Sequence, residues 1–265
     1  VMGCPDVSGV ERKVAWVMEH KTKNKEASVY DKAYDEASSL WSKVEHKKIH
    51  NIICNDITAK LNEYRDQYVH GRILNIGCGT GENIRSLLLK NPIRIMNLDI
   101  SLKGIQKANK QWGGECDFLI SDVHELCFQQ ECFDYIEGIS ILHHLDYKKV
   151  LPQISTILKK KGIAIFMEPG LLNPPAAIAR KFFPTPFHTS DERPFIPWKL
   201  VRECRRSFSR VQVFSFNILT YGISYFLPDN LVTVKFVQLL RICERMFEQN
   251  ILRQFTGHFL IVLHK

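Results

Sequence analysis

The sequence contains no run of about 20 apolar residues, the length that a helix needs to cross a bilayer. The beginning of the chain, with Asp6, Glu11 and Lys13, also lacks the long apolar core of a signal peptide. These absences favour a soluble, cytoplasmic protein whose contact with a membrane is at most peripheral.

The eight cysteines form no Cys-x-x-Cys pair and have no His-x-x-His partner, so we expect no metal site. Their pattern suggests no disulfide framework and fits a reducing cytosol. Cys78 lies inside a glycine-rich segment, where a buried small apolar side chain is its expected role.

Internal repeats, low-complexity linkers and recognisable nucleic-acid-binding modules are absent from the 265 residues. The 36 basic and 28 acidic side chains give a net charge of +8, but the basic residues are scattered rather than striped. Such a charge attracts anionic partners without identifying them. We expect no DNA partner, disfavour RNA, and leave the oligomeric state open. The length suits a single α/β domain, residues 1–265.

The most informative segment is residues 72–82, Arg-Ile-Leu-Asn-Ile-Gly-Cys-Gly-Thr-Gly-Glu, in which an apolar run leads into a Gly-x-Gly-x-Gly loop. Gly77, Gly79 and Gly81 tolerate positive φ and let a ligand approach the backbone. The third glycine falls one residue earlier than in the dinucleotide fingerprint Gly-x-Gly-x-x-Gly. A nicotinamide cofactor is therefore the lesser interpretation.

A second expected strand, residues 93–98, ends at Asp99, about 20 residues beyond the loop, where a carboxylate can accept both hydroxyls of a ribose. The alternative is that Asp99 caps a helix that begins near Ser101. With the glycine loop upstream, ribose binding is the leading interpretation.

Further apolar strands are expected at residues 117–120, 133–138 and 162–167, with a helix over residues 148–160. Asp122 and Val123 follow the third strand, His143 follows the fourth, and Glu168 ends the fifth. Strands that alternate with helices indicate a parallel sheet covered on both faces, with its ligand at the carboxyl ends of the strands.

This ordered set of motifs resembles the class I (Rossmann-like) S-adenosylmethionine (SAM) dependent methyltransferase superfamily, small-molecule type. The match departs at Asn75, where that superfamily usually has an acidic residue. The resemblance implies SAM as cofactor, with S-adenosylhomocysteine as product. It also implies a set of cofactor-binding residues: Tyr30, Asn75, Gly77, Cys78, Gly79, Gly81, Asp99, Ile100, Asp122, Val123, Gly138, Ile139 and His143.

The same resemblance implies the complete fold, a seven-stranded, mostly parallel sheet with helices on both faces. The last two strands would be residues 211–216 and 258–263, the final one inserted antiparallel, with helical material over residues 231–254 between them. An N-terminal helical lid (residues 1–70) would precede the cofactor-binding core (71–170). A cap insertion after the fifth strand (171–200) and the C-terminal part of the sheet (201–265) would follow.

Substrate contacts are expected from the lid and the cap. In the helical pattern of residues 26–37, Tyr30 and Tyr34 share one face, which can close over a pocket or simply pack on the sheet. Residues 168–197 hold seven prolines, which exclude a regular sheet or a long helix. The expected substrate residues are Tyr34, Phe183, Phe187 and Phe195, although the phenylalanines could equally fill a core. A rival interpretation makes residues 176–183 a basic amphipathic segment that touches an anionic membrane.

We therefore expect a biosynthetic enzyme that transfers a methyl group from SAM to O, N or C of a small, largely apolar metabolite. A hydroxyl or carbon acid needs a base near pH 7, and the candidates are His188 oriented by Asp191, His143, and Glu168. Lipid, quinone or RNA methylation and a non-catalytic scaffold of the same fold remain alternatives. The identity of the methyl acceptor depends on cap geometry that the motifs do not encode.

Overall fold

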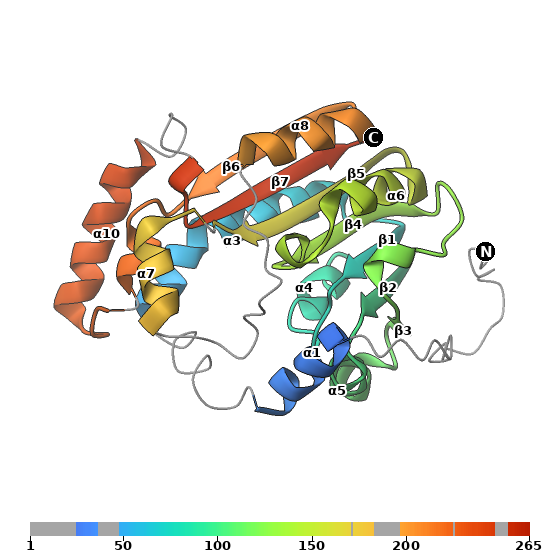
Figure 1. Ribbon diagram of the computed structural model, residues 1–265, viewed down its shortest axis with the longest axis horizontal. Helices are drawn as coiled ribbons and strands as arrows, with labels where there is room; N and C mark the ends of the chain where they lie inside the picture. The colour runs from blue at the N-terminus through green and yellow to red at the C-terminus, as the bar shows by residue number, and fades with distance from the viewer. Residues whose placement is uncertain (1–24, 37–47, 171, 183–196, 225, 247–253) are drawn as a thin grey trace.

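The computed structural model describes residues 25–36, 48–170, 172–182, 197–224, 226–246 and 254–265. Within these ranges one sheet of seven strands has the order β3-β2-β1-β4-β5-β7-β6 (Figure 1). The strands are β1 (Arg72–Ile76), β2 (Arg94–Asp99), β3 (Asp117–Ile120), β4 (Phe133–Ile139), β5 (Leu158–Pro169), β6 (Arg210–Phe216) and β7 (His258–His264). All seven expected strands are present in this sheet.

Strand directions confirm the mostly parallel sheet. The ladders from β3 through β2, β1 and β4 to β5 are parallel, whereas β7 is antiparallel to both β5 and β6. The last strand is thus inserted antiparallel between two strands that precede it in the chain. The carboxyl ends of β1, β2 and β4 consequently meet at one edge of the sheet.

Helices cover both faces of the sheet. They are α1 (Lys25–Glu36), α3 (Lys48–Tyr68), α4 (Ile84–Leu88), α5 (Leu102–Trp112), α6 (Tyr147–Ile157), α7 (Pro174–Phe182), α8 (Pro197–Ser207), α9 (Thr220–Ser224) and α10 (Leu231–Arg245), with 3₁₀ turns η1 (Val123–Glu125) and η2 (Leu142–His144).

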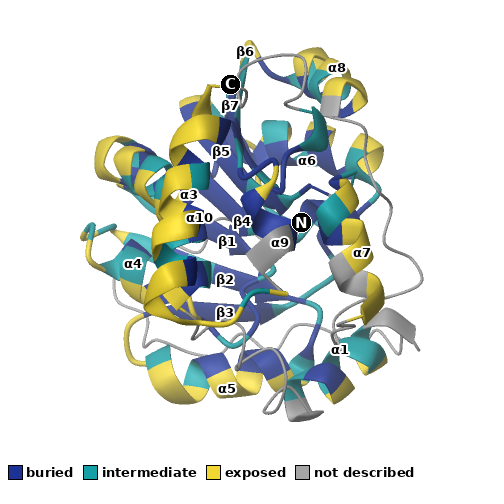
Figure 2. Cartoon of the chain, turned by 90° about the vertical axis from the view of Figure 1, so that its left-hand side faces the viewer, coloured by how far each residue is buried: buried dark blue, intermediate teal, exposed yellow. Residues whose placement is uncertain are grey.

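The core forms two layers because successive strand residues point to opposite faces. One layer joins residues such as Leu74 and Phe166 to α6 and α8, and the other joins Ile73 and Tyr135 to α3, α4 and α5. Figure 2 shows the sheet as the buried centre between these helices. This is the two-faced α/β arrangement expected from the alternating pattern.

The expected lid over residues 1–70 divides into two parts with different positions. Ile57, Leu61 and Tyr64 of α3 are buried in the core layer beneath the sheet, so this helix is a covering helix. Helix α1 instead packs against α5, near the carboxyl end of β2. Within the described residues, α1 alone keeps the position expected of a lid.

The expected helix over residues 148–160 is wrong at its end. Helix α6 stops at Ile157, and β5 begins at Leu158, four residues earlier than the apolar run indicates. Leu158 is fully buried and pairs with Phe133 across the β4–β5 ladder, where a register shift accommodates the three lysines that follow. This tertiary pairing overrides the local helical pattern.

The described cysteines are not all thiols. Cys132 is disulfide-bonded, whereas the free thiols are Cys54, Cys78, Cys116, Cys127, Cys204 and Cys243. The expectation of a chain without disulfides therefore does not hold at Cys132. Among the described helices, none is both long and apolar enough to cross a bilayer.

Candidate functional site

The glycine-rich loop connects β1 to α4 with three residues in the left-handed region. Gly77, Gly79 and Gly81 have φ of +66°, +53° and +90°, which side chains disfavour. A Cβ on Gly79 would lie 2.6 Å from the Tyr34 hydroxyl, and one on Gly77 would lie 2.8 Å from Ile141. The loop therefore requires glycine for its conformation and for the side chains packed on it.

Asp99 binds this loop to the end of β2. Its Oδ2 accepts a hydrogen bond from the Gly79 backbone N–H at 2.8 Å, and its Oδ1 accepts one from the Ser101 N–H at 2.8 Å. Burial raises the pKa of the Asp99 carboxyl, against the effect of these backbone donors. Each carboxylate oxygen retains a further lone pair.

The N-terminus of α5 is capped by Ser101, whose hydroxyl accepts a hydrogen bond from the Gly104 N–H at 3.0 Å. The interpretation of Asp99 as the helix cap is therefore wrong. Ribose binding by Asp99 stays a prediction that fits the geometry.

Helix α1 lies across this region. Asp31 accepts hydrogen bonds from the Ser101 hydroxyl at 2.5 Å and the Lys103 N–H at 3.0 Å. The Tyr34 carbonyl accepts one from Lys107 Nζ, and the Tyr30 ring meets that of His144 edge-on at 5.6 Å. Asp31 was not among the predicted site residues, although it directly follows the predicted residue Tyr30.

Burial sets the protonation of two groups beside the loop. It raises the pKa of Tyr34 well above the ordinary value for a phenol, and the neighbouring Asp99 charge adds to this effect. Burial also raises the pKa of Cys78. Tyr34 is therefore a neutral hydrogen-bond donor and Cys78 an unreactive thiol, as expected of a small buried residue.

Asn75 belongs to a buried polar network on the side of the sheet that α3 covers. Its amide nitrogen donates to Asn97 Oδ1 at 2.9 Å, and its oxygen accepts from Asn83 at 2.9 Å. Asn83 in turn donates to Glu137 at 3.0 Å, and Glu137 forms a two-pronged ion pair with Arg65 at 2.6 and 2.9 Å. The network explains why an amide suffices at this position: it braces the loop from beneath.

The residues after β3 have mainly structural contacts. Asp122 accepts hydrogen bonds from the His124 N–H at 2.9 Å and pairs with the His124 ring, while Val123 is buried in the core. The side chain of Asp122 keeps about a third of its surface exposed (34%), which leaves it accessible to a ligand. Contacts of Asp122, Val123 and the neighbouring Ile100 with a cofactor stay predictions.

Gly138 and Ile139 complete the end of β4. A Cβ on Gly138 would lie 2.7 Å from Ile141 and 2.8 Å from Phe166, so packing alone requires this glycine. Ile141 thus contacts the positions of both Gly77 and Gly138, which brings the segment after β4 against the glycine loop.

His143 and Glu168 form a buried pair at the carboxyl ends of β4 and β5. His143 Nδ1 lies 2.7 Å from Glu168 Oε2. The other oxygen, Oε1, accepts from the backbone N–H groups of Ile141 at 3.1 Å and Leu142 at 2.8 Å. Glu168 therefore orients both the ring and the turn that carries it. Two candidate catalytic residues from separate motifs are brought together here.

The remaining candidates from the cap lie outside the described residues: Phe183, Phe187, His188, Asp191 and Phe195. Their expected roles in substrate handling stay predictions.

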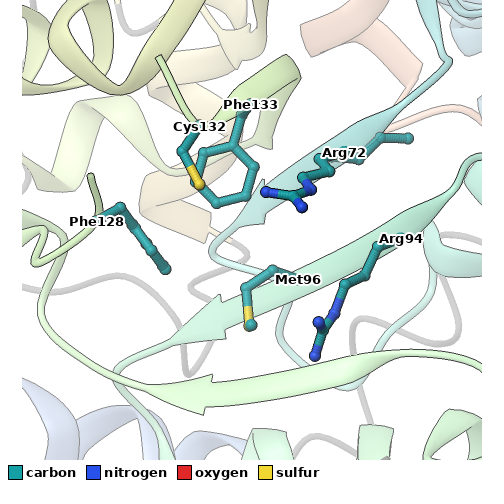
Figure 3. A pocket seen from close by; sticks show the side chains of 7 residues that line it. Arg72, Arg94, Met96, Phe128, Cys132 and Phe133 are labelled. Atoms are coloured by element: carbon teal, nitrogen blue, oxygen red, sulfur yellow. The ribbon is translucent and has the colours of Figure 1, made fainter. Parts of the chain in front are cut away.

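A separate small pocket lies at the opposite end of the strands. Figure 3 shows Arg72, Met96 and Phe133 among its lining side chains, which come from the beginnings of β1, β2 and β4 and their flanking segments. Arg94, another lining residue, is paired with Asp117. The pocket is remote from the glycine loop and takes no part in the site described above.

The geometry at the glycine loop fits a nucleoside-bearing cofactor. The buried Asp99 carboxylate, which accepts the Gly79 N–H, can accept further hydrogen bonds from hydroxyl donors. Tyr30 and Tyr34 border the same region from α1. In such a site Asp99 would hold the ribose, and the backbone of the glycine loop would approach the rest of the cofactor.

Comparison with known proteins finds methyltransferases among the similar sequences and structures. Residues 74–166, from β1 to β5, match the family model described as "Methyltransferase domain". The O-methyltransferase rstn1 of Aspergillus nomiae is 26% identical over 144 residues, which cover 51% of this chain and 64% of that protein. The 27-O-demethylrifamycin SV methyltransferase of Amycolatopsis mediterranei is 26% identical over 162 residues, covering 55% of this chain and 58% of that protein. The chain thus spans about three fifths of the length of these two relatives.

A solved SAM-dependent methyltransferase from Archaeoglobus fulgidus has the same fold. It superimposes with a TM-score of 0.54 at 18% identity, covering 80% of this chain and 94% of that one. The domain match and the fold together give SAM as the cofactor of the site. Residues 74–166 of this chain thus match a methyltransferase domain, and the chain has the fold of SAM-dependent methyltransferases.

Proposed function

We propose that this protein transfers the methyl group of SAM to an oxygen, nitrogen or carbon atom of a small, largely apolar metabolite. The observation that carries the proposal is the buried His143–Glu168 pair, which lies on the segment that packs against the glycine loop. A base at the edge of a cofactor site suits an acceptor that must lose a proton.

The sulfonium of bound SAM supplies an activated methyl group, so the main task of the protein is alignment and exclusion of water. Holding an acceptor in line at about 3 Å can contribute roughly 7–11 kcal/mol of the barrier. Tyr34 on α1 packs on Gly79 of the loop and Tyr30 packs on His144, so both side chains would help to exclude water.

His143 is the proposed general base. When Nδ1–H donates to the Glu168 carboxylate, the neutral ring keeps its lone pair on Nε2, which can accept the acceptor's proton. Glu168 is a positioning residue in this scheme because its contacts are with the His143 ring and the backbone of the same turn. The protonated imidazole that forms is stabilised by this buried carboxylate.

The two relatives support an oxygen acceptor. Each is named as an O-methyltransferase or as the methyltransferase of an O-demethylated compound. A hydroxyl acceptor is also the class for which a histidine base is most useful near pH 7. We therefore place hydroxylated, largely apolar metabolites first among candidate substrates.

The test is methyl transfer from labelled SAM to a panel of apolar phenols and alcohols by the full chain. We expect at least one acceptor to be methylated, and we expect His143→Ala to slow this transfer by at least about 100-fold while SAM affinity stays within a few fold. His70→Ala is the matched control, because His70 is exposed and lies outside the site. Equal turnover in His143→Ala would remove His143 from the mechanism.

A further inference from the structure

Helix α10 has its polar and apolar faces reversed relative to an ordinary surface helix. The inward side carries Thr233, Arg241 and Glu244, all buried, and Val237 as its fully buried apolar residue. The outward side carries apolar residues along its whole length: Leu231, Val232, Phe236, Leu239, Ile242 and Met246. A surface helix normally turns such a stripe towards the core.

Ion pairs hold α10 in this orientation. Arg241 binds both Asp56 of α3 and Glu244, and Arg245 binds Asp56 at 2.8 Å. Glu244 also accepts hydrogen bonds from the N–H groups of Leu219 at 2.8 Å and Thr220 at 3.1 Å. Turning the apolar stripe inward would break these ion pairs and leave the buried Thr220 N–H without its acceptor. The apolar face therefore stays outward.

The exposed apolar surface extends beyond α10. Phe182 at the end of α7 is 66% exposed, and its ring meets the ring of the half-exposed Phe226 at 6.3 Å. Helix α7 packs against α9, and α10 packs against α9 and α3, so these helices form one end of the molecule (Figure 1). Figure 2 looks onto this end. Contiguous apolar surface of this kind marks an interaction site.

The charges on this surface are mainly positive. Lys181 on α7 and Lys235 on α10 are exposed, and the Arg245 side chain is 56% exposed. Glu244 is buried and Asp56 is engaged by two arginines. Asp229, before the helix begins, is exposed and accepts a hydrogen bond from the Lys48 N–H.

We propose that this surface, formed by the outward face of α10 with Ile178 and Phe182 of α7, docks on an anionic lipid membrane. Aromatic and aliphatic side chains would enter the headgroup boundary while the neighbouring lysines meet anionic lipids. A second copy of the chain fits less well, because facing copies would bring these cations together. The surface lies on α7 and α10, away from the glycine loop, and its binding to lipid does not depend on methyl transfer.

The position of this surface links it to the proposed site. Helix α7 begins five residues after β5 ends, and Asn173 anchors the connection by donating to the carbonyls of Ile218 and Phe255 at 2.6 Å. Docking would therefore bring the carboxyl end of β5, next to Glu168, towards the bilayer.

The experiment is co-sedimentation of the full chain with vesicles of phosphatidylcholine alone or mixed with phosphatidylglycerol. We expect binding to the anionic vesicles, and we expect Phe236→Glu/Leu239→Glu to weaken partitioning by more than about tenfold through loss of two apolar insertions. The matched control is Leu89→Glu/Ile93→Glu, which adds the same charges at residues that are 70% and 75% exposed on the β2 side of the molecule. This control should bind within about twofold of wild type, with residual differences set by net charge.

A second variant separates charge from apolar insertion. Lys181→Gln/Lys235→Gln should reduce binding to anionic vesicles by about thirtyfold, at about 1 kcal/mol per charge. Calorimetric titration of each variant with SAM should give wild-type affinity. This would show that the variant is folded and that its cofactor site is unaffected by the loss of vesicle binding. Absence of vesicle binding, equal binding to neutral vesicles, or a dimer that dissociates in Phe236→Glu/Leu239→Glu without any lipid binding would overturn the proposal.

Discussion

The glycine-loop end of the sheet and the α7–α10 end are both built around buried charged groups, but they use them in opposite ways. At the loop, Asp99 and Glu137 are turned inward and hold the glycine loop and the residues that brace it. At α10, Arg241 and Glu244 are turned inward only to hold an apolar face outward. The comparison teaches that buried ion pairs can brace a loop in one region and an exterior surface in another.

The largest expected effect tests catalysis at the loop end. His143→Ala should lower turnover by roughly 10²–10⁴-fold, the usual contribution of a positioned general base. Because the α7–α10 end is untouched, vesicle binding by this variant should equal that of wild type. Steady-state kinetics with a saturating acceptor would measure the change, and Glu168→Gln should show a smaller loss with an altered pH profile.

Two variants, each of which lacks one buried acid, test whether the two regions are independent. Glu137→Ala leaves Arg65 as an unpaired buried charge and should destabilise the fold by about 3–5 kcal/mol. Loss of the Glu137 carboxylate should also weaken SAM binding, because Asn83 and Asn75 brace the loop through Glu137. Urea unfolding and calorimetry measure the two effects.

Glu244→Ala should separate the regions, since it loosens α10 and reduces vesicle binding while SAM affinity is kept. Glu63→Ala is the control for both variants, because its pair with Lys60 is exposed and worth less than about 1 kcal/mol. Equal loss of SAM affinity in Glu137→Ala and Glu244→Ala would contradict the division into two regions.

Gly79→Ala should destabilise the protein by about 1–3 kcal/mol, because it forces an alanine into positive φ and against the Tyr34 hydroxyl. Gly114→Ala is the matched control: nothing lies within 4 Å of a Cβ there, so the change should stay within about 0.5 kcal/mol. Thermal unfolding distinguishes the two. Similar midpoints would show that the loop conformation is not constrained as described.

Low pH should reduce the free energy of unfolding through His258, which lies at the start of β7 on the α7–α10 side of the molecule. Burial lowers the pKa of His258 to about 3, and its ring meets the Tyr221 ring edge-on with centroids 4.1 Å apart. The unfolded chain protonates this residue near pH 6.5, so the stability it contributes is complete above that pH and is lost as pH falls towards 3. Between pH 7 and pH 5 the loss should be about 1–2 kcal/mol.

The variant His258→Gln isolates this contribution. Its free energy of unfolding in urea should fall less between pH 7 and pH 5 than that of wild type. Parallel curves for the two proteins would show that His258 does not remain neutral in the folded state.

The sequence predicted those parts of the molecule that depend on local pattern. Most strands are buried apolar runs, and the spacing of Gly77, Gly79 and Gly81 indicates a loop whose backbone can approach a ligand. The order of the motifs, together with the family resemblance, then gave the whole sheet, including the antiparallel insertion of β7. A lid role for α1, suggested by Tyr30 and Tyr34, stays a prediction.

Features that depend on register and distance could not be predicted. Arg65 and Glu137 are 72 residues apart and meet only because α3 crosses the β4 ladder at that point. The helical periodicity of residues 231–245 predicts a stripe, but which side faces inward depends on Asp56 of α3. Likewise, the early start of β5 at Leu158 depends on its pairing with Phe133.

The most direct test of the central claim is calorimetric titration of the full chain with SAM, beside Asp99→Ala and a parallel titration with NAD. We predict micromolar SAM binding by wild type, no binding of NAD, and a loss of SAM affinity of more than about tenfold in Asp99→Ala, the effect of removing a charged acceptor. Absence of SAM binding by well-folded wild-type protein, or equal affinity in Asp99→Ala, would contradict the assignment of this edge of the sheet as the cofactor site.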